Sequence, residues 1–256
     1  MFGPLINRLL RPLGYSVVST ARLSTLQKFD NYKPSENVVA EHLHHLFTRH
    51  QVDCVFDVGA NDGAYAKMLR KEAGYEGWIF SFEPIPKQIA TLQELASKDS
   101  KWEVCPYALG ASAGKQDFNI MTQDVFSSFL PPASGQPEKY LESNRIAETL
   151  EVQIRTVGEV WNEVKAQYGL ERLYLKMDTQ GFDMEVFAGA ASVLDSIPAL
   201  QSELSQRQLY QGAPDLRSAL EAFAKAGYEP SMLHPISFED DLRFIEADGI
   251  LVRATG

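Results

Sequence analysis

A short stretch of small and acidic residues could bring a ligand against the backbone: Asp57-Val58-Gly59-Ala60-Asn61-Asp62-Gly63. It directly follows an apolar run, so we place it where a buried strand turns into a helix. Gly59 and Gly63 remove side chains that would block the approach. The dinucleotide fingerprint needs G-x-G-x-x-G, and Asn61 stands where its second glycine would fall. The stretch is therefore poorly matched to a pyrophosphate.

A second acidic residue, Glu83, ends the next apolar run about 20 to 25 residues further on, with Pro84 directly after it. A carboxylate at that place can accept hydrogen bonds from both hydroxyls of a ribose. S-adenosylmethionine presents a ribose, a sulfonium and an amino-acid end but no phosphate, so acidic residues attract it. We therefore predict a site for this cofactor, and its contacts are Asp57, Gly59, Ala60, Asn61, Gly63, Glu83, Pro84, Ala108, Leu109 and Asp178. In the alternative interpretation, Gly59 and Gly63 only form a tight turn, and Glu83 is a solvated carboxylate at the end of a strand.

Lys176 and Asp178 are two residues apart on an apolar segment, so on a strand their side chains project to the same face. A buried lysine costs several kcal/mol unless it is paired, so Asp178 or another carboxylate accompanies it, or it lies in a polar cleft. A self-contained ion pair is one interpretation. In the other, Asp178 lies beside the sulfonium and orients the acceptor hydroxyl or attracts its proton. Glu203 and His234 are weaker catalytic candidates.

Apolar periodicity predicts alternating strands and helices. The expected strands are 54–58, 78–82, 103–107, 152–155, 173–177 and 199–203, and the expected helices begin near 36, 62 and 87 and cover 160–168, 184–194 and 216–226. Residues 244–246 and 250–253 flank Ala247-Asp248-Gly249 and predict a hairpin with an Asp-Gly turn. The chain is thus expected to be α/β, with a Rossmann-like, mostly parallel, doubly wound sheet and a C-terminal antiparallel hairpin. That is the outline of class I methyltransferases.

The expected domain organisation is an N-terminal helical extension over residues 1–50 and a methyltransferase domain over 51–256. Residues 111–148 are rich in Gly, Ser and Pro, and we expect a lid or substrate loop there, with a plain connection as the alternative. Residues 1–14 have apolar residues on one helical face with Arg8 and Arg11 beside it. This pattern suits weak contact with a membrane surface or packing of a helix on its own domain.

The net charge, the cysteines and the histidines limit the ligands and the cellular compartment that we expect for this protein. The 256 residues carry a formal net charge of −10, so a nucleic acid would be repelled unless basic residues were clustered, and no such cluster is seen. The cysteines, Cys54 and Cys105, lie in apolar runs and indicate reduced thiols in a cytoplasmic protein. Among the histidines, His44 and His45 point to different helical faces, so we predict no metal site.

The segment Tyr174-Leu-Lys-Met-Asp-Thr-Gln-Gly-Phe-Asp-Met-Glu-Val186, continuing to Ala188-Gly-Ala190, resembles the FkbM-type methyltransferases. Such proteins tend to show a strand ending Lys-hydrophobic-Asp, a Gln-Gly or Glu-Gly step, and an acidic helix running to Gly-Ala. The resemblance covers about residues 50 to 253 and includes 57–63, Glu83, 108–110, Ser127-Ser128, 155–157, 176–189, Glu203 and 246–253. Two positions depart from the pattern, because Asp183 and Gln180 stand where Glu is commoner.

The resemblance implies an O-methyltransferase that acts on a hydroxyl of a saccharide, a glycolipid or a secondary metabolite. The oligomeric state is left open. The alternatives are an oxidoreductase with a nucleotide cofactor and a non-catalytic binding module of the same fold. An oxidoreductase would need phosphate contacts that the turn from Gly59 to Gly63 does not supply.

Overall fold

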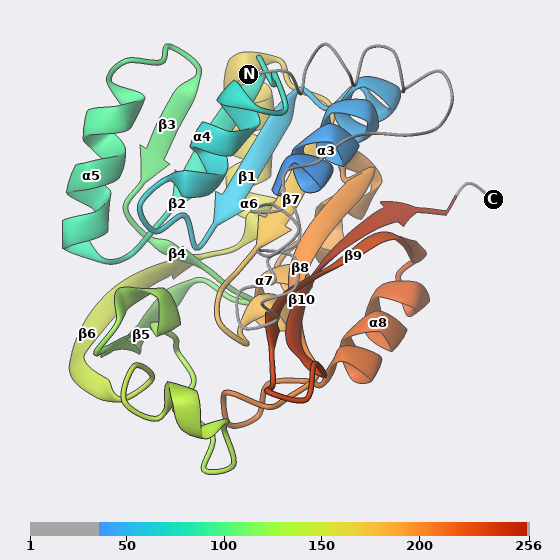
Figure 1. The fold of residues 1–256 in the computed structure, drawn as a ribbon. Helices are drawn as coiled ribbons and strands as arrows, with labels where there is room; N and C mark the ends of the chain where they lie inside the picture. The colour runs from blue at the N-terminus through green and yellow to red at the C-terminus, as the bar shows by residue number, and fades with distance from the viewer. Residues whose placement is uncertain (1–35, 255–256) are drawn as a thin grey trace, which may run out of the picture. The chain divides into compact units, whose positions relative to one another are not determined.

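The computed structural model describes residues 36–254 of the chain (Figure 1). Most of the N-terminal extension expected over residues 1–50, and the membrane-surface contact expected for residues 1–14, lie outside the described residues. Within residues 36–254, no helix is long and apolar enough to cross a membrane.

A seven-stranded sheet with the order β3-β2-β1-β7-β8-β10-β9 forms the centre of the fold. Its parallel strands are β1 (Cys54–Val58), β2 (Trp78–Phe82), β3 (Trp102–Cys105), β7 (Leu173–Met177) and β8 (Ala199–Ser205). The antiparallel edge consists of β10 (Phe244–Arg253) and β9 (Tyr228–Phe238). The predicted fold class, a mostly parallel Rossmann-like sheet with a C-terminal antiparallel hairpin, is confirmed.

Helices cover both faces of this sheet because side chains along each buried strand point alternately to either side. Val55, Ile79 and Tyr174 belong to one apolar cluster, and Phe56 and Phe80 belong to the other. The first cluster includes residues of α3 (Glu36–His50), α4 (Ala64–Lys71) and α5 (Pro86–Ala96), and the second includes residues of α6 (Val157–Tyr168), α7 (Asp183–Ala188) and α8 (Leu216–Lys225). Short 3-10 helices cover Asp124–Phe126, Glu138–Tyr140 and Ala191–Ser196.

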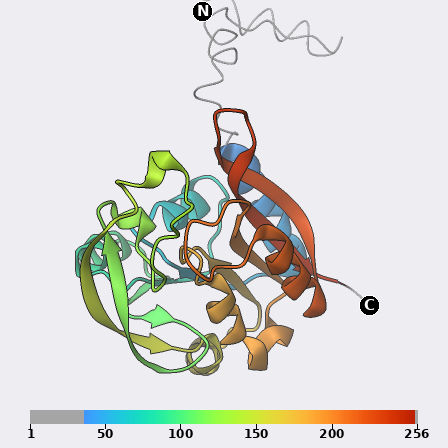
Figure 2. The same ribbon diagram turned by 90° about the horizontal axis from the view of Figure 1, so that it is seen from below.

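A second, three-stranded sheet interrupts the stretch that we expected to be irregular. It consists of β4 (Ala108–Leu109), β5 (Gly114–Met121) and β6 (Ile146–Arg155), in the order β4-β6-β5. β5 was not predicted from the sequence, because its first half is polar and exposed and lacks the apolar alternation of a half-buried strand. Its apolar part packs inward, where the ring centroid of Phe118 lies 4.9 Å from that of Phe129. Figure 2, seen from below, shows this small sheet and the β9–β10 hairpin on opposite sides.

The predicted Asp-Gly turn at residues 247–249 is wrong, because β10 runs unbroken through it. Gly249 instead permits close packing, since a Cβ there would come 2.4 Å from Cδ1 of Leu204. The real hairpin partner, β9, contains Pro230 and Pro235, which argue against an interior strand. β9 accommodates them because it is the edge strand of the sheet.

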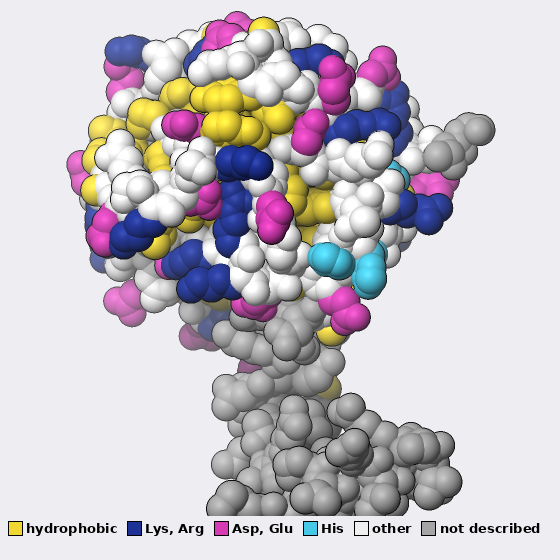
Figure 3. Space-filling view, turned by 90° about the horizontal axis from the view of Figure 1, so that it is seen from above, with side chains coloured by type: hydrophobic (Ala, Val, Ile, Leu, Met, Phe, Trp, Pro, Cys, Tyr) yellow, Lys and Arg dark blue, Asp and Glu magenta, His cyan; other side chains and the backbone are white. Residues whose placement is uncertain are grey.

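The end of the molecule that Figure 3 shows has mixed charge. Lys and Arg side chains are interspersed with Asp and Glu there, and hydrophobic side chains are exposed between them (Figure 3). Each sign of charge thus has the other near it, as is usual for a solvated surface.

Candidate active site

A cavity of about 180 Å³ lies where the carboxyl ends of the parallel strands meet the small sheet. It is lined by Val58, Gly59, Asn61, Phe82, Glu83, Pro84, Ile85, Ala108, Leu109, Phe118, Asp124, Val125, Ser127, Phe129, Asp178, Thr179, Gln180 and Glu203. The loops after β1, β2 and β7, which contribute Gly59, Glu83 and Asp178, therefore converge on one space, as the sequence predicts.

The turn after β1 is built around a close approach of two loops. Gly59 has φ +75°, and a Cβ there would lie 2.0 Å from the backbone oxygen of Asp178. Asn61 is also left-handed, with φ 45°, and its N–H points at Glu83. Ala60 and Gly63 do not line the cavity. Gly63 precedes α4, where its backbone packs against the side chain of Leu92 on α5.

Glu83 is nearly buried, with 4% exposure, yet it lines the cavity. Its Oε2 accepts a hydrogen bond from the N–H of Asn61 and its Oε1 accepts one from the N–H of Ile85, each at 2.9 Å. Burial raises the pKa of Glu83 to about 7, although these two backbone hydrogen bonds act in the opposite direction. A carboxylate has about four acceptor positions, so two remain for hydroxyl groups of a ligand.

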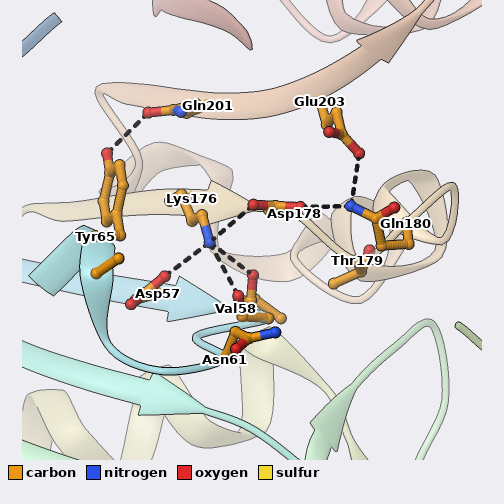
Figure 4. Close-up of polar contacts among 12 residues, drawn as sticks. Asp57, Val58, Asn61, Tyr65, Lys176, Asp178, Thr179, Gln180, Gln201 and Glu203 are labelled. Carbon is orange, nitrogen blue, oxygen red and sulfur yellow. Dashed lines mark hydrogen bonds and ion pairs between the residues drawn. The ribbon is translucent and has the colours of Figure 1, made fainter. Parts of the chain in front are cut away.

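Lys176 holds the ends of β1 and β7 together (Figure 4). Its Nζ lies 2.9 Å from Oδ1 of Asp57 and 3.5 Å from Oδ2 of Asp178, and it donates to the backbone oxygen of Gly59 at 3.1 Å. Burial by itself lowers the pKa of Lys176, but the carboxylates of Asp57 and Asp178 outweigh it and raise the pKa. The sequence left open whether Lys176 has a carboxylate partner or lies in a polar cleft, and the structure pairs it with Asp57 and, less closely, with Asp178.

Asp57 itself lies beneath the cavity and does not line it. The residue is fully buried, and its Oδ1 lies 2.9 Å from the ammonium group of Lys176. The ion pair with Lys176 therefore compensates its charge. The acidic residue of the first motif stabilises the lysine instead of reaching a ligand directly.

Asp178 and Glu203 lie on the same side of the cavity, and the side chain of Gln180 lies between them (Figure 4). Burial, and then the nearby carboxylates of Glu246 and Asp178, raise the pKa of Glu203 well above its ordinary value. Glu203 therefore favours its protonated form, whereas Asp178 is paired with the ammonium group of Lys176. Of the two carboxyl groups, Asp178 is the better placed to take up a proton.

His234 is not brought to the cavity. We expected it in a loop, but it lies on β9 opposite Asp248 of β10 and is absent from the cavity lining. The histidines of α3 are surface groups: His44 hydrogen-bonds to the backbone oxygen of Ala73, and His42 hydrogen-bonds to Ser231. Among residues 36–254, no group of three or more His, Cys, Asp or Glu side chains is arranged to hold a metal ion.

Sequence reasoning missed the residues that close the far side of the cavity. Asp124, Val125, Ser127 and Phe129 line it from the segment that follows β5. Asp124 fixes this segment, because its Oδ2 accepts from Nζ of Lys87 at 2.9 Å and from Nε2 of the neighbouring Gln88 at 2.8 Å. The Ser127-Ser128 pair, quoted for the family resemblance, was the available signal.

The buried carboxyl group of Glu246 makes the free energy of unfolding depend on pH. Burial and then the carboxylate of Asp178 raise the pKa of Glu246 to about 7. The folded state thus retains a proton that the unfolded chain loses above about pH 4.5. This contribution to stability is full below that pH and is lost as pH rises through about 7.

We therefore expect Glu246→Gln to be more stable than the unmodified protein at pH 8, by about 1–3 kcal/mol, and similar to it at pH 4.5. Thermal unfolding at both pH values measures the difference. Glu229→Gln, an exposed position on β9, is the matched control. An equal pH dependence of the melting temperature in Glu246→Gln and in the unmodified protein would contradict the assignment.

The family model and the curated relative that match this chain are both methyltransferases. The family model described as the methyltransferase FkbM domain matches residues 57–230. The 2-O-methyltransferase NoeI of Sinorhizobium fredii (strain NBRC 101917 / NGR234) is 28% identical over 176 residues, which are 65% of this chain and 69% of NoeI.

Two solved structures illustrate the structural similarity. Methyltransferase FkbM from Methylobacillus flagellatus KT matches with a TM-score of 0.47 and 14% identity, over 77% of this chain and 43% of that one. The chain thus spans less than half of the length of that protein. Magnesium protoporphyrin IX methyltransferase from Synechocystis PCC 6803, solved with bound S-adenosylmethionine, matches with a TM-score of 0.45 and 8% identity, over 99% of this chain and 98% of that one.

Proposed function

Because the chain belongs to the FkbM methyltransferase family, we propose that it transfers a methyl group from S-adenosylmethionine to a hydroxyl of a saccharide, glycolipid or secondary-metabolite acceptor. The observation that carries the proposal is the single cavity that Gly59, Glu83 and Asp178 line together. Such a cleft at the carboxyl ends of parallel strands is where α/β proteins bind their ligands.

The cavity suits a sulfonium nucleoside. Glu83 has two acceptor positions left for the ribose hydroxyls after its backbone hydrogen bonds are made. Ala108 and Leu109 supply an apolar wall for the adenine ring, and Gly59 lets the ligand approach the backbone. When bound, S-adenosylmethionine supplies a methyl group that is open to nucleophilic attack.

Asp178 is the residue that we assign to the acceptor hydroxyl. Methyl transfer to a hydroxyl needs alignment of the oxygen and removal of its proton. Asp178 lines the cavity, and the ammonium group of Lys176 lies 3.5 Å from its Oδ2, so an ion pair holds this carboxyl group at the cavity. Lys176 itself is nearly buried and positions Asp178, while Glu203 in its protonated form can donate a hydrogen bond to an acceptor oxygen.

The charge of the cavity favours a neutral acceptor. The ionisable residues that line it are all acidic, namely Glu83, Asp124, Asp178 and Glu203, and no Lys or Arg is among the described residues of the lining. A phosphorylated acceptor or a nucleic acid would therefore meet repulsion at the reacting end. Hydroxyl groups, in contrast, can donate to these carboxylates, which agrees with the similarity to a 2-O-methyltransferase.

We assign the segment at residues 122–141 to a lid that covers the acceptor. Asp124, Val125, Ser127 and Phe129 already form one wall of the cavity. The side chain of Val125 is 56% exposed, so an apolar group at the cavity rim is free to contact a ligand.

Two binding titrations and one activity screen test the function. Calorimetric titration with S-adenosylmethionine and with NAD separates a methyltransferase from a nucleotide-cofactor oxidoreductase, and we expect heat of binding with the former alone. Methyl transfer from isotope-labelled cofactor to neutral saccharides and glycolipids, followed by mass spectrometry, then separates an enzyme from a binding module. Binding of NAD in preference to S-adenosylmethionine would refute the proposal.

Glu83→Ala is expected to weaken S-adenosylmethionine binding by about 1–3 kcal/mol, since it removes charge-assisted hydrogen bonds to the ribose. The dissociation constant measured by calorimetry reports the loss, and Glu229→Ala on the surface of β9 serves as the control. An unchanged affinity in Glu83→Ala would remove Glu83 from the cofactor site.

A further inference from the structure

Gln180 lies between the two carboxyl groups at the acceptor end of the cavity. Its Nε2 donates to Oδ1 of Asp178 and to Oε2 of Glu203, each at 3.0 Å (Figure 4). A side-chain amide carries two N–H hydrogens, so one hydrogen serves each carboxyl group. We propose that Gln180 is a positioning residue, whose amide holds Asp178 and Glu203 side by side to receive one acceptor hydroxyl. This inference rests on the proposed function.

Tyr210 contacts the other end of that amide. Its hydroxyl lies 2.8 Å from Oε1 of Gln180 and 2.8 Å from the backbone oxygen of Phe126. Burial, and then the carboxyl groups of Glu203 and Glu246, raise the pKa of Tyr210, so the hydroxyl keeps its proton and can donate. A flipped amide would turn its carbonyl oxygen toward two carboxyl groups and its N–H groups toward the tyrosine. The single hydrogen of the hydroxyl is shared between Oε1 of Gln180 and the backbone oxygen of Phe126, so the orientation of the amide depends chiefly on the two carboxyl oxygens that accept from Nε2.

The surrounding structure holds the backbone of Gln180 in an unfavourable conformation. Its φ of 55° is left-handed, which is unfavourable for a residue with a side chain. The backbone oxygen of Gln180 accepts from Oγ of Ser128 at 2.8 Å. At the next residue, Gly181, a Cβ would come 2.9 Å from Cβ of Ala213, so the following segment packs tightly against this turn. Backbone strain of this kind collects at functional sites, where the surroundings enforce it.

The charges around the pair explain why an amide suits position 180. Glu203 faces the carboxyl groups of Glu246, Asp178, Asp183 and Asp248, all of which raise its pKa. A carboxyl group here, the commoner residue in the resembled family, can donate only one hydrogen bond, and only when it is protonated. A neutral amide instead donates to both, so the two carboxyl groups can stay close together. Asp178 has a further partner in the ammonium group of Lys176.

The titration of Glu203 tests the contact without any acceptor. Gln180→Gly keeps the left-handed backbone free of strain and removes the amide. We expect the midpoint of the Glu203 carboxyl, followed by ¹³C NMR and assigned from its loss in Glu203→Gln, to rise by about one pH unit in this variant. Gln153→Leu, an exposed amide on β6, should leave the midpoint unchanged. A change below about 0.2 unit in Gln180→Gly would overturn the proposal.

Turnover tests the positioning role. On an acceptor that the unmodified protein methylates, Gln180→Gly should lower kcat at least about tenfold and leave the KM for S-adenosylmethionine within about twofold. Gln180→Glu should lose activity in its ionised form and regain part of it as pH falls, because a protonated carboxyl again donates a hydrogen bond. Equal losses of kcat for Gln180→Glu at all pH values would contradict the role. If no acceptor is methylated, the proposed function fails, while the NMR titration still decides whether the amide holds Glu203.

Discussion

Asp178→Asn is expected to slow methyl transfer by about 10²–10⁴-fold, the usual contribution of a positioned acid or base. The substitution keeps the shape of the side chain, and the amide of Gln180 can still donate to its oxygen. What it removes is the negative charge beside Lys176 and the capacity to take up a proton. Cofactor affinity should change little, because Glu83 and the turn after β1 are untouched.

The turnover number kcat is measured on an acceptor that the unmodified protein methylates, and the dissociation constant of S-adenosylmethionine is measured by calorimetry. Asp117→Asn, an exposed position on β5, controls for the loss of one negative charge. Full turnover in Asp178→Asn would remove this residue from the mechanism. A large loss of cofactor affinity with normal kcat would instead make it a binding residue.

Lys176→Met should destabilise the folded protein by about 3–5 kcal/mol, as when one partner of a buried ion pair is removed. Asp57 has no exposed surface, and Nζ of Lys176 lies 2.9 Å from its Oδ1. Without the lysine, Asp57 must either remain charged in an apolar environment or take up a proton. Urea unfolding at pH 7 measures the loss.

A double variant distinguishes charge from packing. Asp57→Asn combined with Lys176→Met leaves no buried charge at this place, so it should recover about half or more of the lost free energy of unfolding. Lys115→Met breaks an exposed ion pair with Glu151 and should leave the free energy of unfolding nearly unchanged. A double variant that is no more stable than Lys176→Met would show that the lysine acts through packing alone.

The strands could be predicted where they depend on residues that are neighbours in the sequence. The apolar runs at 54–58, 78–82 and 173–177 coincide with β1, β2 and β7 as the structure has them. Elsewhere the boundaries move, since the strand expected at 103–107 is β3 at Trp102–Cys105. The helix expected over 184–194 is divided between α7 and a 3-10 helix.

The sequence by itself determined which residues stand at the carboxyl ends of the parallel strands. Apolar periodicity locates the strands, and parallel strands end at one edge of their sheet. The convergence of Gly59, Glu83 and Asp178 follows from those two facts without knowledge of any contact.

The tertiary structure alone decided which side chains meet across long stretches of chain. Asp57 and Lys176 are 119 positions apart and pair because β1 and β7 are neighbours in the sheet. Gln180 lies between Asp178 and Glu203 because of a left-handed backbone that Ser128, 52 positions away, helps to hold. Local periodicity carries no information about such contacts, since each depends on how separate elements pack.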